Sequence, residues 1–410
     1  MLSINIERLS GFLASMAEIG ASANGGCNRQ ALTKLDQQGR ALFIQWCRAI
    51  GGRPRLDEVG NLFVRWTGRD DTLAPVVMGS HLDTQSTGGR FDGVYGVLAA
   101  LEVMYCLHEN QQQLERPIEI VVWMNEEGAR FRPAMMGSGV FAAAFDQQTI
   151  YETTDSDGVS VYQALCEAGQ LGDEPCVPFD IHAALELHIE QGPILERSCI
   201  PVGVVEGVQG MNWFTVTLKG QSVHAGPTPM DMRCDPVQAL PELLQQCYAL
   251  ADDDPATRVT IGALSALPGA TNTVPESVQF SVDLRHPHQE ILDELSHQLS
   301  ILCDSDMGNI SCELKMIWRS PAVHFDSHCI QTVRQSCTYL GIPSMPIISG
   351  AGHDSVYLSR VAPTSMIFIP CKDGISHNEN EYATPDDLET GANVLLHSVL
   401  ALASEKENIL

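Results

Sequence analysis

The chain has 410 residues and a mass of 44.6 kDa, which predicts two domains, because one hydrophobic core rarely organises so long a chain. Its 24 Lys and Arg residues against 51 Asp and Glu residues leave a net charge of −27, which excludes nucleic acid and membrane surfaces as expected partners. The 13 cysteines form no CxxC pair, and the N-terminal segment is too charged for a signal-peptide core, so we expect free thiols and a cytoplasmic protein.

The first half of the chain alternates patterns typical of helices and of buried strands. After an amphipathic N-terminal helix, we expect helices over residues 31–50 and 94–109 and strands over residues 61–66, 74–78, 118–124 and 185–189. This alternation predicts an α/β domain with a mainly parallel central sheet. Polar residues directly follow the buried strands, where open α/β sheets place their functional sites.

The pattern changes near residue 211. We expect strands over residues 212–220, 258–264 and 277–284 and helices over 236–252 and 289–303, followed by strands over 345–348 and 364–369 and a last helix over 385–402. The chain is therefore predicted to form a catalytic domain from residues 1–210 and 326–410, interrupted by a smaller α+β module over residues 211–325.

Histidines and carboxylates follow the predicted strands or lie in loops beside them at five places. They are the HxD pair His81 and Asp83, Asp92 in GGRFDGVYG, the adjacent Glu126 and Glu127, His188 in ELHIEQG, and His377 in GISHNENEYA. An HxD pair or a solvated Glu pair is common in proteins without any such site, so each motif alone is weak. Together they favour a divalent-metal site at one edge of the sheet.

The adjacent glutamates suit hydrolysis by metal-activated water. A divalent ion makes its bound water a nucleophile near neutral pH, and a carboxylate that is not a ligand can pass the proton of that water to a leaving nitrogen. Neighbouring residues at the end of a strand point in different directions, so one glutamate can bind metal while the other acts as base. The string GAGHDS, residues 350–355, is not a GxSxG nucleophile elbow and indicates a glycine-rich turn.

These motifs resemble the L-carbamoylase, allantoate amidohydrolase and β-ureidopropionase family, within the larger group of two-metal aminoacylase-like and carboxypeptidase-like hydrolases. The matching strings, in chain order, are GSHLDT, GGRFDGVYGVLA, NEEGARF, ELHIEQGPILE, GQSVHAGPTPM, NTVP, DLRH, SGAGHDS and GISHNENE. The resemblance runs from about residue 57 to residue 390. It implies a catalytic domain with an inserted lid and dimerisation domain, which agrees with the break near residue 211.

The resemblance also implies a role for each motif residue. His81, Asp92 and His188 would bind one divalent ion, and Asp92 would bridge to a second ion that Glu127 and His377 complete. Glu126 would be the general base and then the acid, while Asp83 would orient His81. Two ions per subunit are expected, either Zn or Mn, with Co or Ni as alternatives. Related peptidases typically carry a carboxylate in the place of His188, which makes a dipeptidase the weaker expectation.

The expected substrate is a small anion that carries a ureido group. The planar fork of Arg285, in DLRH, suits a carboxylate, although a surface salt bridge explains such an arginine equally well from the residues alone. The resemblance implies substrate contacts from Gln191, His224, Asn272, Arg285 and the backbone of Gly352. Among these, His224 and Asn272 could polarise the ureido oxygen.

The predicted activity is metal-dependent hydrolysis of N-carbamoyl-L-amino acids to the amino acid, ammonia and carbon dioxide. Allantoate and N-carbamoyl-β-alanine are the alternative substrates. Met211, in VQGMNW, favours an apolar substrate side chain, whereas allantoate-type relatives tend to carry Gln there. A dipeptidase and a catalytically inactive binding or dimerisation protein on the same fold are the remaining alternatives. The resemblance further implies a homodimer.

Overall fold

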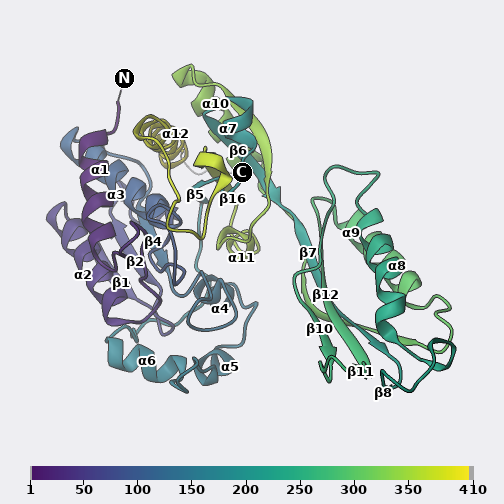
Figure 1. The fold of residues 1–410 in the computed structure, drawn as a ribbon. Helices are drawn as coiled ribbons and strands as arrows, with labels where there is room; N and C mark the ends of the chain where they lie inside the picture. The colour runs from purple at the N-terminus through teal and green to yellow at the C-terminus, as the bar shows by residue number, and fades with distance from the viewer. Residues whose placement is uncertain (1, 406–410) are drawn as a thin grey trace. The chain divides into compact units, whose positions relative to one another are not determined.

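The computed structural model describes residues 2–405 and divides the chain into two compact units (Figure 1). The first unit runs to Glu206 and resumes at His324, and the second comprises Gly207–Val323. Among the helices of residues 2–405, none combines the length and the apolar composition that crossing a membrane requires.

The first unit is built on a mixed sheet whose strand order, over the described residues, is β1-β2-β4-β3-β5-β16-β6-β14, with β15 paired to β6. Strands β4, β3, β5 and β16 are parallel neighbours, while β2 and β6 flank them in antiparallel pairs. This parallel centre confirms the predicted α/β class. The strands are β1 (Arg53–Leu56), β2 (Leu62–Trp66), β3 (Val76–His81), β4 (Ile118–Trp123), β5 (Ala183–Ile189), β6 (Val202–Val208), β14 (Val323–His324), β15 (Ser344–Ser349) and β16 (Thr364–Ile369).

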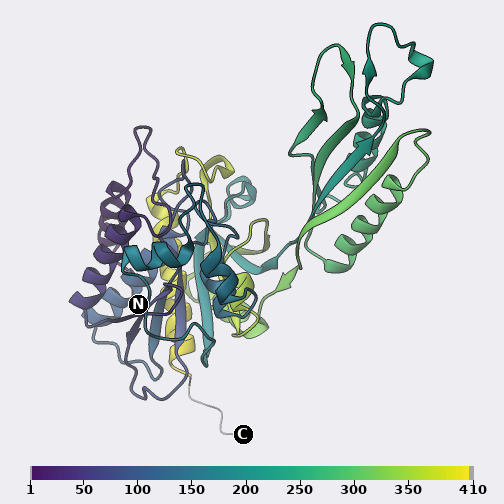
Figure 2. The ribbon, with the colours of Figure 1, turned by 90° about the horizontal axis from the view of Figure 1, so that it is seen from below.

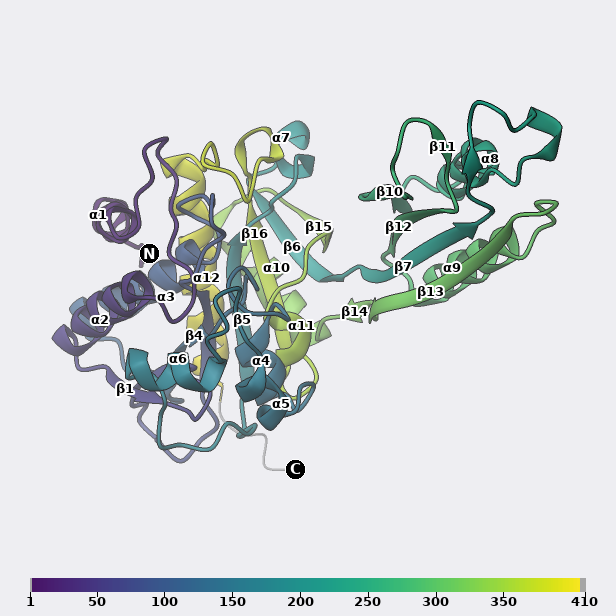
Figure 3. The ribbon, with the colours of Figure 1, turned by 60° about the horizontal axis from the view of Figure 1, so that its bottom comes forward.

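Both faces of this sheet are covered, so the central strands β3, β4, β5 and β16 are buried along their whole length. Val76 and Met78 of β3 belong to one hydrophobic cluster and Val77 to the other, because successive side chains of a strand point to opposite faces. Figure 3 shows α1, α2 and α3 grouped on one side. The helices are α1 (Ile6–Glu18), α2 (Lys34–Ala49), α3 (Val94–Glu109), α4 (Met136–Phe141), α5 (Gln147–Glu152), α6 (Val161–Ala168), α7 (Ile194–Ser198), α10 (Ser327–Leu340), α11 (Ser355–Leu358) and α12 (Pro385–Ala403), with a 3₁₀ turn at Lys372–Gly374.

The second unit is an antiparallel sheet covered by two helices (Figure 2). Its strands run in the order β10-β12-β7-β13, with β9 beside β12 and a separate two-stranded ladder of β8 and β11. Phe214, Val216 and Leu218 alternate into the core beneath α8 and α9. The elements are β7 (Gly210–Lys219), β8 (Val223–His224), β9 (Arg258–Thr260), β10 (Leu264–Leu267), β11 (Thr273–Val274), β12 (Ser277–His286), β13 (Ser311–Ser320), α8 (Pro236–Ala249), α9 (Gln289–Cys303) and a 3₁₀ turn at Met230–Met232.

Candidate metal centre

The parallel strands bring the predicted ligands to one edge of the first sheet. Strand β3 ends at His81, β5 carries His188 near its end, and the segment after β4 carries Glu126 and Glu127. The segment after β16 carries His377. Because the carboxyl ends of parallel strands meet at one edge, residues far apart in the sequence converge there.

His81, Asp92 and His188 form one group whose ligand atoms lie within 4.8 Å of one another. Asp92 Oδ1 lies 3.6 Å from His81 Nε2 and 3.1 Å from His188 Nε2. The other ring nitrogens face backbone carbonyls, with His81 Nδ1 2.9 Å from the carbonyl oxygen of Asp83 and His188 Nδ1 2.9 Å from that of Ile189. An Nδ1–H that donates to a carbonyl fixes the tautomer in which Nε2 carries the lone pair that a cation can bind.

Asp92, Glu127 and His377 form a second group on the opposite oxygen of the same carboxylate. His377 Nε2 lies 3.3 Å from Asp92 Oδ2 and 3.1 Å from Glu127 Oε2. Asp92 therefore presents one oxygen to each group. The set of three imidazoles and two carboxylates fits divalent ions of the Zn, Mn, Co and Ni type, which accept mixed nitrogen and oxygen ligands.

A third group, made of Glu186, His188 and His353, also brings ligand atoms together. Here the atoms are already hydrogen-bonded. Glu186 accepts the hydroxyls of Ser80 and Ser355 at 2.7 and 2.6 Å. The His353 ring packs edge-on against His188 with a centroid separation of 4.7 Å. Because Glu186 and His353 already contact serine hydroxyls, we interpret this group as structural support beside the first group.

The pKa shifts of Asp92 and His377 are those expected where carboxylates are arranged to bind a cation. Burial alone would raise the pKa of Asp92, but hydrogen bonds with His188, His377 and His81 lower it well below its ordinary value. Hydrogen bonds with Asp92 and Glu127 raise the pKa of His377 to about 11. In the protein without metal, the imidazole proton thus neutralises carboxylates that a metal ion would otherwise neutralise.

Glu126 lies beside the first group and belongs to none of the ligand sets. Its Oε2 is 3.4 Å from His81 Nε2. Burial raises the pKa of Glu126 well above its ordinary value, with further increases from Asp354 and Glu127 and an opposing effect of His81. A carboxyl whose pKa is raised in this way is suited to accept and return a proton during catalysis.

The structure places Asp83 differently from its expected role. The carboxylate accepts the peptide N–H groups of Glu126 and Glu127, at 3.3 and 3.2 Å. Its nearer oxygen lies 3.9 Å from His81 Nδ1, which instead meets the carbonyl oxygen of Asp83. The backbone of residue 83 therefore orients His81, and its side chain holds the glutamate pair.

Gly93 allows the first group to form. Its φ of 66° is a left-handed conformation, and a Cβ there would lie 2.3 Å from the His81 ring. The Gly93 N–H also donates to His188 Nε2 at 3.0 Å. A side chain at this position would displace His81, so the glycine is required by both its conformation and its neighbours.

Two of the predicted substrate contacts lie in the first unit. Gln191 Nε2 donates to Asp92 Oδ2 at 2.7 Å, and its backbone has a φ of 57°. Gly352 lies in the loop before α11, where a Cβ would come within 3.0 Å of the Met135 side chain. The structure therefore brings Gln191 directly to the shared carboxylate.

The other three predicted substrate contacts belong to the second unit. His224 and Asn272 lie together, since His224 pairs with Thr273 in the β8–β11 ladder and the Asn272 carbonyl accepts the N–H of Ala225. Both side chains are exposed. Arg285, on β12, forms an ion pair with Asp283 at 2.8 Å.

Three residues beside the predicted ligands were not among the predicted site residues: Gln85, Ser376 and Glu381. Gln85 donates its side-chain amide to Glu127 Oε2 at 2.8 Å and its peptide N–H to Oε1 at 3.1 Å. Glu381 accepts the peptide N–H of Asp92, and the Ser376 hydroxyl donates to Asp92 Oδ2. All three lie inside or directly beside the motifs quoted above. A polar residue next to a predicted ligand could therefore have been predicted to contact it.

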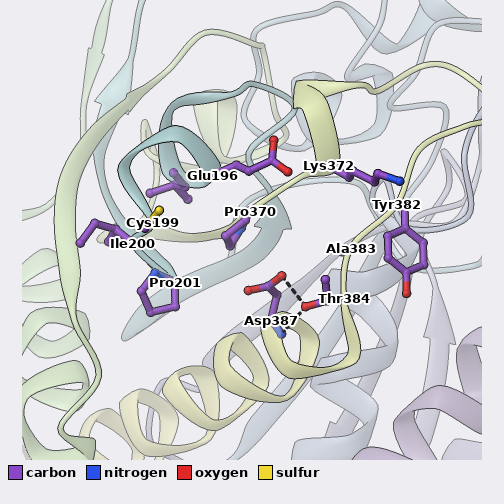
Figure 4. Close-up of a pocket in the computed structure, with 11 residues that line it drawn as sticks. Glu196, Cys199, Ile200, Pro201, Pro370, Lys372, Tyr382, Ala383, Thr384 and Asp387 are labelled. Carbon is purple, nitrogen blue, oxygen red and sulfur yellow. Dashed lines mark hydrogen bonds between the residues drawn. The ribbon is translucent and has the colours of Figure 1, made fainter.

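A hollow of about 530 Å³ lies elsewhere in the first unit, between α7, the segment after β16 and the start of α12. Figure 4 shows residues that line it. None of the predicted metal ligands lines it. Thr384 and Asp387, which do, are hydrogen-bonded to each other as the cap of α12. The hollow is therefore distinct from the candidate metal centre.

Comparison with known proteins gives consistent matches. Residues 77–401 match the model of peptidase family M20/M25/M40. The chain is 40% identical over 405 residues to an N-carbamoyl-L-amino-acid amidohydrolase of Rhizobium meliloti, covering 98% of this chain and 97% of that protein. It is 33% identical over 401 residues to an allantoate amidohydrolase of Bacillus subtilis, with coverage of 96% and 97%.

Solved structures agree with the sequence matches. An amidase of the hydantoinase/carbamoylase family from Burkholderia multivorans is 45% identical, with a TM-score of 0.93 and coverage of 98% of this chain and 99% of that chain. These findings confirm the resemblance that the motifs carry.

Proposed function

Since the chain belongs to peptidase family M20/M25/M40, we propose that it hydrolyses the carbamoyl C–N bond of N-carbamoyl-L-amino acids and releases the amino acid, ammonia and carbon dioxide. The observation that carries this proposal is Asp92, whose two oxygens each face a separate group of potential metal ligands, beside the carboxyl of Glu126, which belongs to neither group. The full-length similarity to an N-carbamoyl-L-amino-acid amidohydrolase supports the choice of substrate.

The hydrolases of this family are metal-dependent, and the first unit has ligand groups that fit a metal. In our proposal two divalent ions per subunit, Zn or Mn with Co or Ni as alternatives, are held by His81, His188, Asp92, Glu127 and His377. When bound, such ions lower the pKa of water and polarise the carbonyl that is attacked. The residues around them then have to place the ligands, move one proton and hold the substrate.

Glu126 moves the proton in this proposal. Its carboxylate takes a proton from the attacking water and returns it to the nitrogen that leaves as the C–N bond breaks. The peptide of Glu126 is held by Asp83, so its side chain starts from a fixed backbone. Gln191 contributes by holding Asp92 Oδ2.

In our proposal, residues of the second unit recognise the substrate. Arg285 binds the substrate carboxylate in two-pronged fashion, and Asp283 keeps the guanidinium oriented when no substrate is present. His224 and Asn272, adjacent in the β8–β11 ladder, polarise the ureido oxygen and stabilise the negative charge that develops on it. In the first unit, the backbone of Gly352 is a further proposed substrate contact.

Allantoate is the second candidate substrate, because the Bacillus subtilis relative named above is an allantoate amidohydrolase. N-carbamoyl-β-alanine is the third. Met211 lies near the start of β7, and its apolar, flexible side chain favours an apolar substrate group over a second ureido group.

The proposal is tested by a substrate panel. Metal-stripped protein is reconstituted separately with Zn, Mn, Co and Ni, and kcat/KM is measured for N-carbamoyl-L-methionine, allantoate, N-carbamoyl-β-alanine and a dipeptide. We expect the highest value for the first compound. Turnover of the dipeptide with no ureido hydrolysis would replace the proposal with a dipeptidase, and absence of bound metal would favour an inactive binding protein.

Glu126→Gln tests the mechanism. We expect kcat to fall by about 10²–10⁴-fold with bound metal unchanged, because the amide cannot take the proton of water. Glu167→Gln, an exposed glutamate on α6, is the matched control and should leave kcat unchanged. Equal turnover of Glu126→Gln and the parent would remove Glu126 from the mechanism.

We also propose a homodimer in the cytoplasm, acting on a small anionic substrate. Sedimentation equilibrium should give twice the mass of the chain. A single species of 44.6 kDa would contradict the dimer.

A further inference from the structure

Glu381 connects the loop that carries His377 to the loop that carries Asp92. It is 3% exposed, and its Oε1 accepts the peptide N–H groups of Phe91 and Asp92 at 2.9 and 3.0 Å. These residues are about 290 positions apart in the sequence. The bonds satisfy two backbone donors in a buried loop, where unmade hydrogen bonds are costly.

Ser376 extends this connection to the side chain of Asp92. Its hydroxyl lies 2.9 Å from Asp92 Oδ2 and 3.0 Å from Glu381 Oε2. Gln191 Nε2 donates to the same Asp92 oxygen at 2.7 Å. The oxygen that faces His377 is therefore oriented by hydrogen bonds from two other chain segments.

The two loops are packed too closely for Glu381 to be an incidental neighbour. A Cβ on Gly89 would lie 2.1 Å from Glu381 Oε1. The loop of Asp92 thus lacks a side chain at the place where the Glu381 carboxylate enters it. Glu381 itself belongs to none of the potential ligand groups among residues 2–405.

We propose that Glu381 is a positioning residue, which acts with Ser376 to hold Asp92 and His377 in the geometry that the group of Asp92, Glu127 and His377 needs to bind its divalent ion. The inference rests on the proposed metal-dependent function. Glu381 acts through hydrogen bonds to the Asp92 peptide and to Ser376, and it touches neither metal nor substrate. Residues that orient metal ligands commonly contribute 10–100-fold to metal affinity or activity, by the order of magnitude seen elsewhere.

Glu379 offers a matched control on the same loop. Its carboxylate accepts the hydroxyl of Ser22 and the side-chain amide of Asn24, the latter at 2.7 Å. Both partners belong to the N-terminal segment rather than to the Asp92 loop. Glu379→Ala therefore removes this carboxylate's bonds to the N-terminal segment and leaves every bond to Asp92 and Ser376 in place.

The experiment measures metal binding to the full-length chain. Metal-stripped parent, Glu381→Ala, Glu381→Gln, Ser376→Ala and Glu379→Ala are titrated with Mn²⁺ by calorimetry, and bound metal is counted by elemental analysis. For Glu381→Ala we expect one Mn²⁺ to bind about 10–100-fold more weakly and the other to bind nearly as in the parent. Its kcat should fall while KM changes little.

The remaining variants separate hydrogen bonding from charge and from loop folding. Gln can still accept both peptide N–H groups and donate to Ser376, so Glu381→Gln should bind Mn²⁺ within a few-fold of the parent. Glu379→Ala should match the parent. Ser376→Ala, which keeps the two backbone bonds, should weaken the same ion by a smaller factor than Glu381→Ala.

Three results would overturn the inference. They are parent-like binding of both ions by Glu381→Ala, an equal loss in Glu379→Ala, and a loss in Glu381→Gln as large as in Glu381→Ala. If Glu381→Ala does not fold, as circular dichroism would show, Ser376→Ala and Glu381→Gln decide the question. A parent protein that binds no Mn²⁺, Zn²⁺, Co²⁺ or Ni²⁺ would contradict the proposed function instead.

Discussion

The carboxylate of Asp83 accepts the peptide N–H of Glu126, with 3.3 Å between Oδ1 and the nitrogen. The second oxygen accepts the N–H of Glu127 at 3.2 Å. Asp83→Asn would turn an NH₂ group toward a peptide N–H, so one of these bonds is lost and the glutamate pair shifts. We expect kcat for N-carbamoyl-L-methionine to fall by about 10–100-fold with KM little changed.

The control for Asp83→Asn is Asp71→Asn, which removes a surface ion pair to Arg65. Its kcat should equal that of the parent. If Asp83→Asn had the same kcat as the parent, the hydrogen bonds from the peptides of Glu126 and Glu127 to Asp83 would make no contribution to catalysis.

Arg285 gives a prediction about recognition. In our proposal its guanidinium binds the substrate carboxylate, so Arg285→Lys should lower kcat/KM for N-carbamoyl-L-methionine by about 10–100-fold, the equivalent of one charged hydrogen bond of about 1.5–3 kcal/mol. The corresponding N-carbamoyl amino amide, which has no carboxylate, should lose much less.

Arg258→Lys is the matched control, because Arg258 faces Arg285 in the register of β9 and β12. Arg258→Lys should leave kcat/KM unchanged for both N-carbamoyl-L-methionine and the corresponding amide. An equal loss for the acid and the amide in Arg285→Lys would show that Arg285 does not read the carboxylate.

His377 makes metal binding and stability depend on pH in opposite ways. Hydrogen bonds with Asp92 and Glu127 raise its pKa to about 11, so the metal-free folded protein holds a proton between pH 6.5 and 11 that the unfolded chain releases. This contribution to stability is complete below pH 6.5 and is lost as the pH rises toward 11. Metal must displace the same proton, so metal affinity rises with pH.

Differential scanning fluorimetry in EDTA between pH 7 and 9.5 checks the stability half of this prediction. His377→Gln should flatten the decline in Tm. Mn²⁺ titrations at pH 6.5 and 8 check the other half. A metal affinity that does not change with pH would refute it.

Arg29 gives a prediction about stability. Its guanidinium is buried and donates to the carbonyl oxygens of Leu82, Met16 and Ile19 at 2.9, 2.9 and 2.7 Å. Arg29→Met keeps the bulk but leaves these buried acceptors unpaired, so the free energy of unfolding should fall by about 3 kcal/mol.

Urea unfolding of the metal-free protein measures this change. Arg48→Met, at an exposed position near the end of α2, should change the free energy of unfolding by less than about 0.5 kcal/mol. A similar small change in Arg29→Met would mean that water replaces the lost donors.

The ligand residues at the strand ends are predictable from the sequence, because each of them ends or follows an apolar run that is typical of a buried strand. The predicted strand 74–78 is observed as β3, which runs on to His81 itself, and the predicted helix 31–50 begins at Lys34 because Thr33 caps it. Periodicity and capping are local signals, and they locate His81, Glu126 and His188 without knowledge of the fold.

Other features depend on information that no local pattern holds. Helix α10 escapes prediction because its buried face is made of Cys329, Thr332, Ser336 and Cys337 around a single valine rather than of large apolar residues. Strand β13 lies at a sheet edge, and its polar and apolar residues alternate only as far as Met316, because the register shifts between Met316 and Trp318. Glu381 contacts the loop of Asp92, which is 289 positions away from it in the sequence, and this contact is visible only in the folded chain.

Gly89 and Gly93 have a consequence for how this chain can be changed. A side chain at residue 89 would occupy the space of the Glu381 carboxylate, and one at residue 93 the space of the His81 ring. In a library that randomises residues 88–93, we expect these two positions to return glycine among active clones, whereas the exposed Arg90 accepts many residues. Substitutions intended to change the substrate are therefore better placed in the second unit, where residues such as Met211 are not proposed to bind metal.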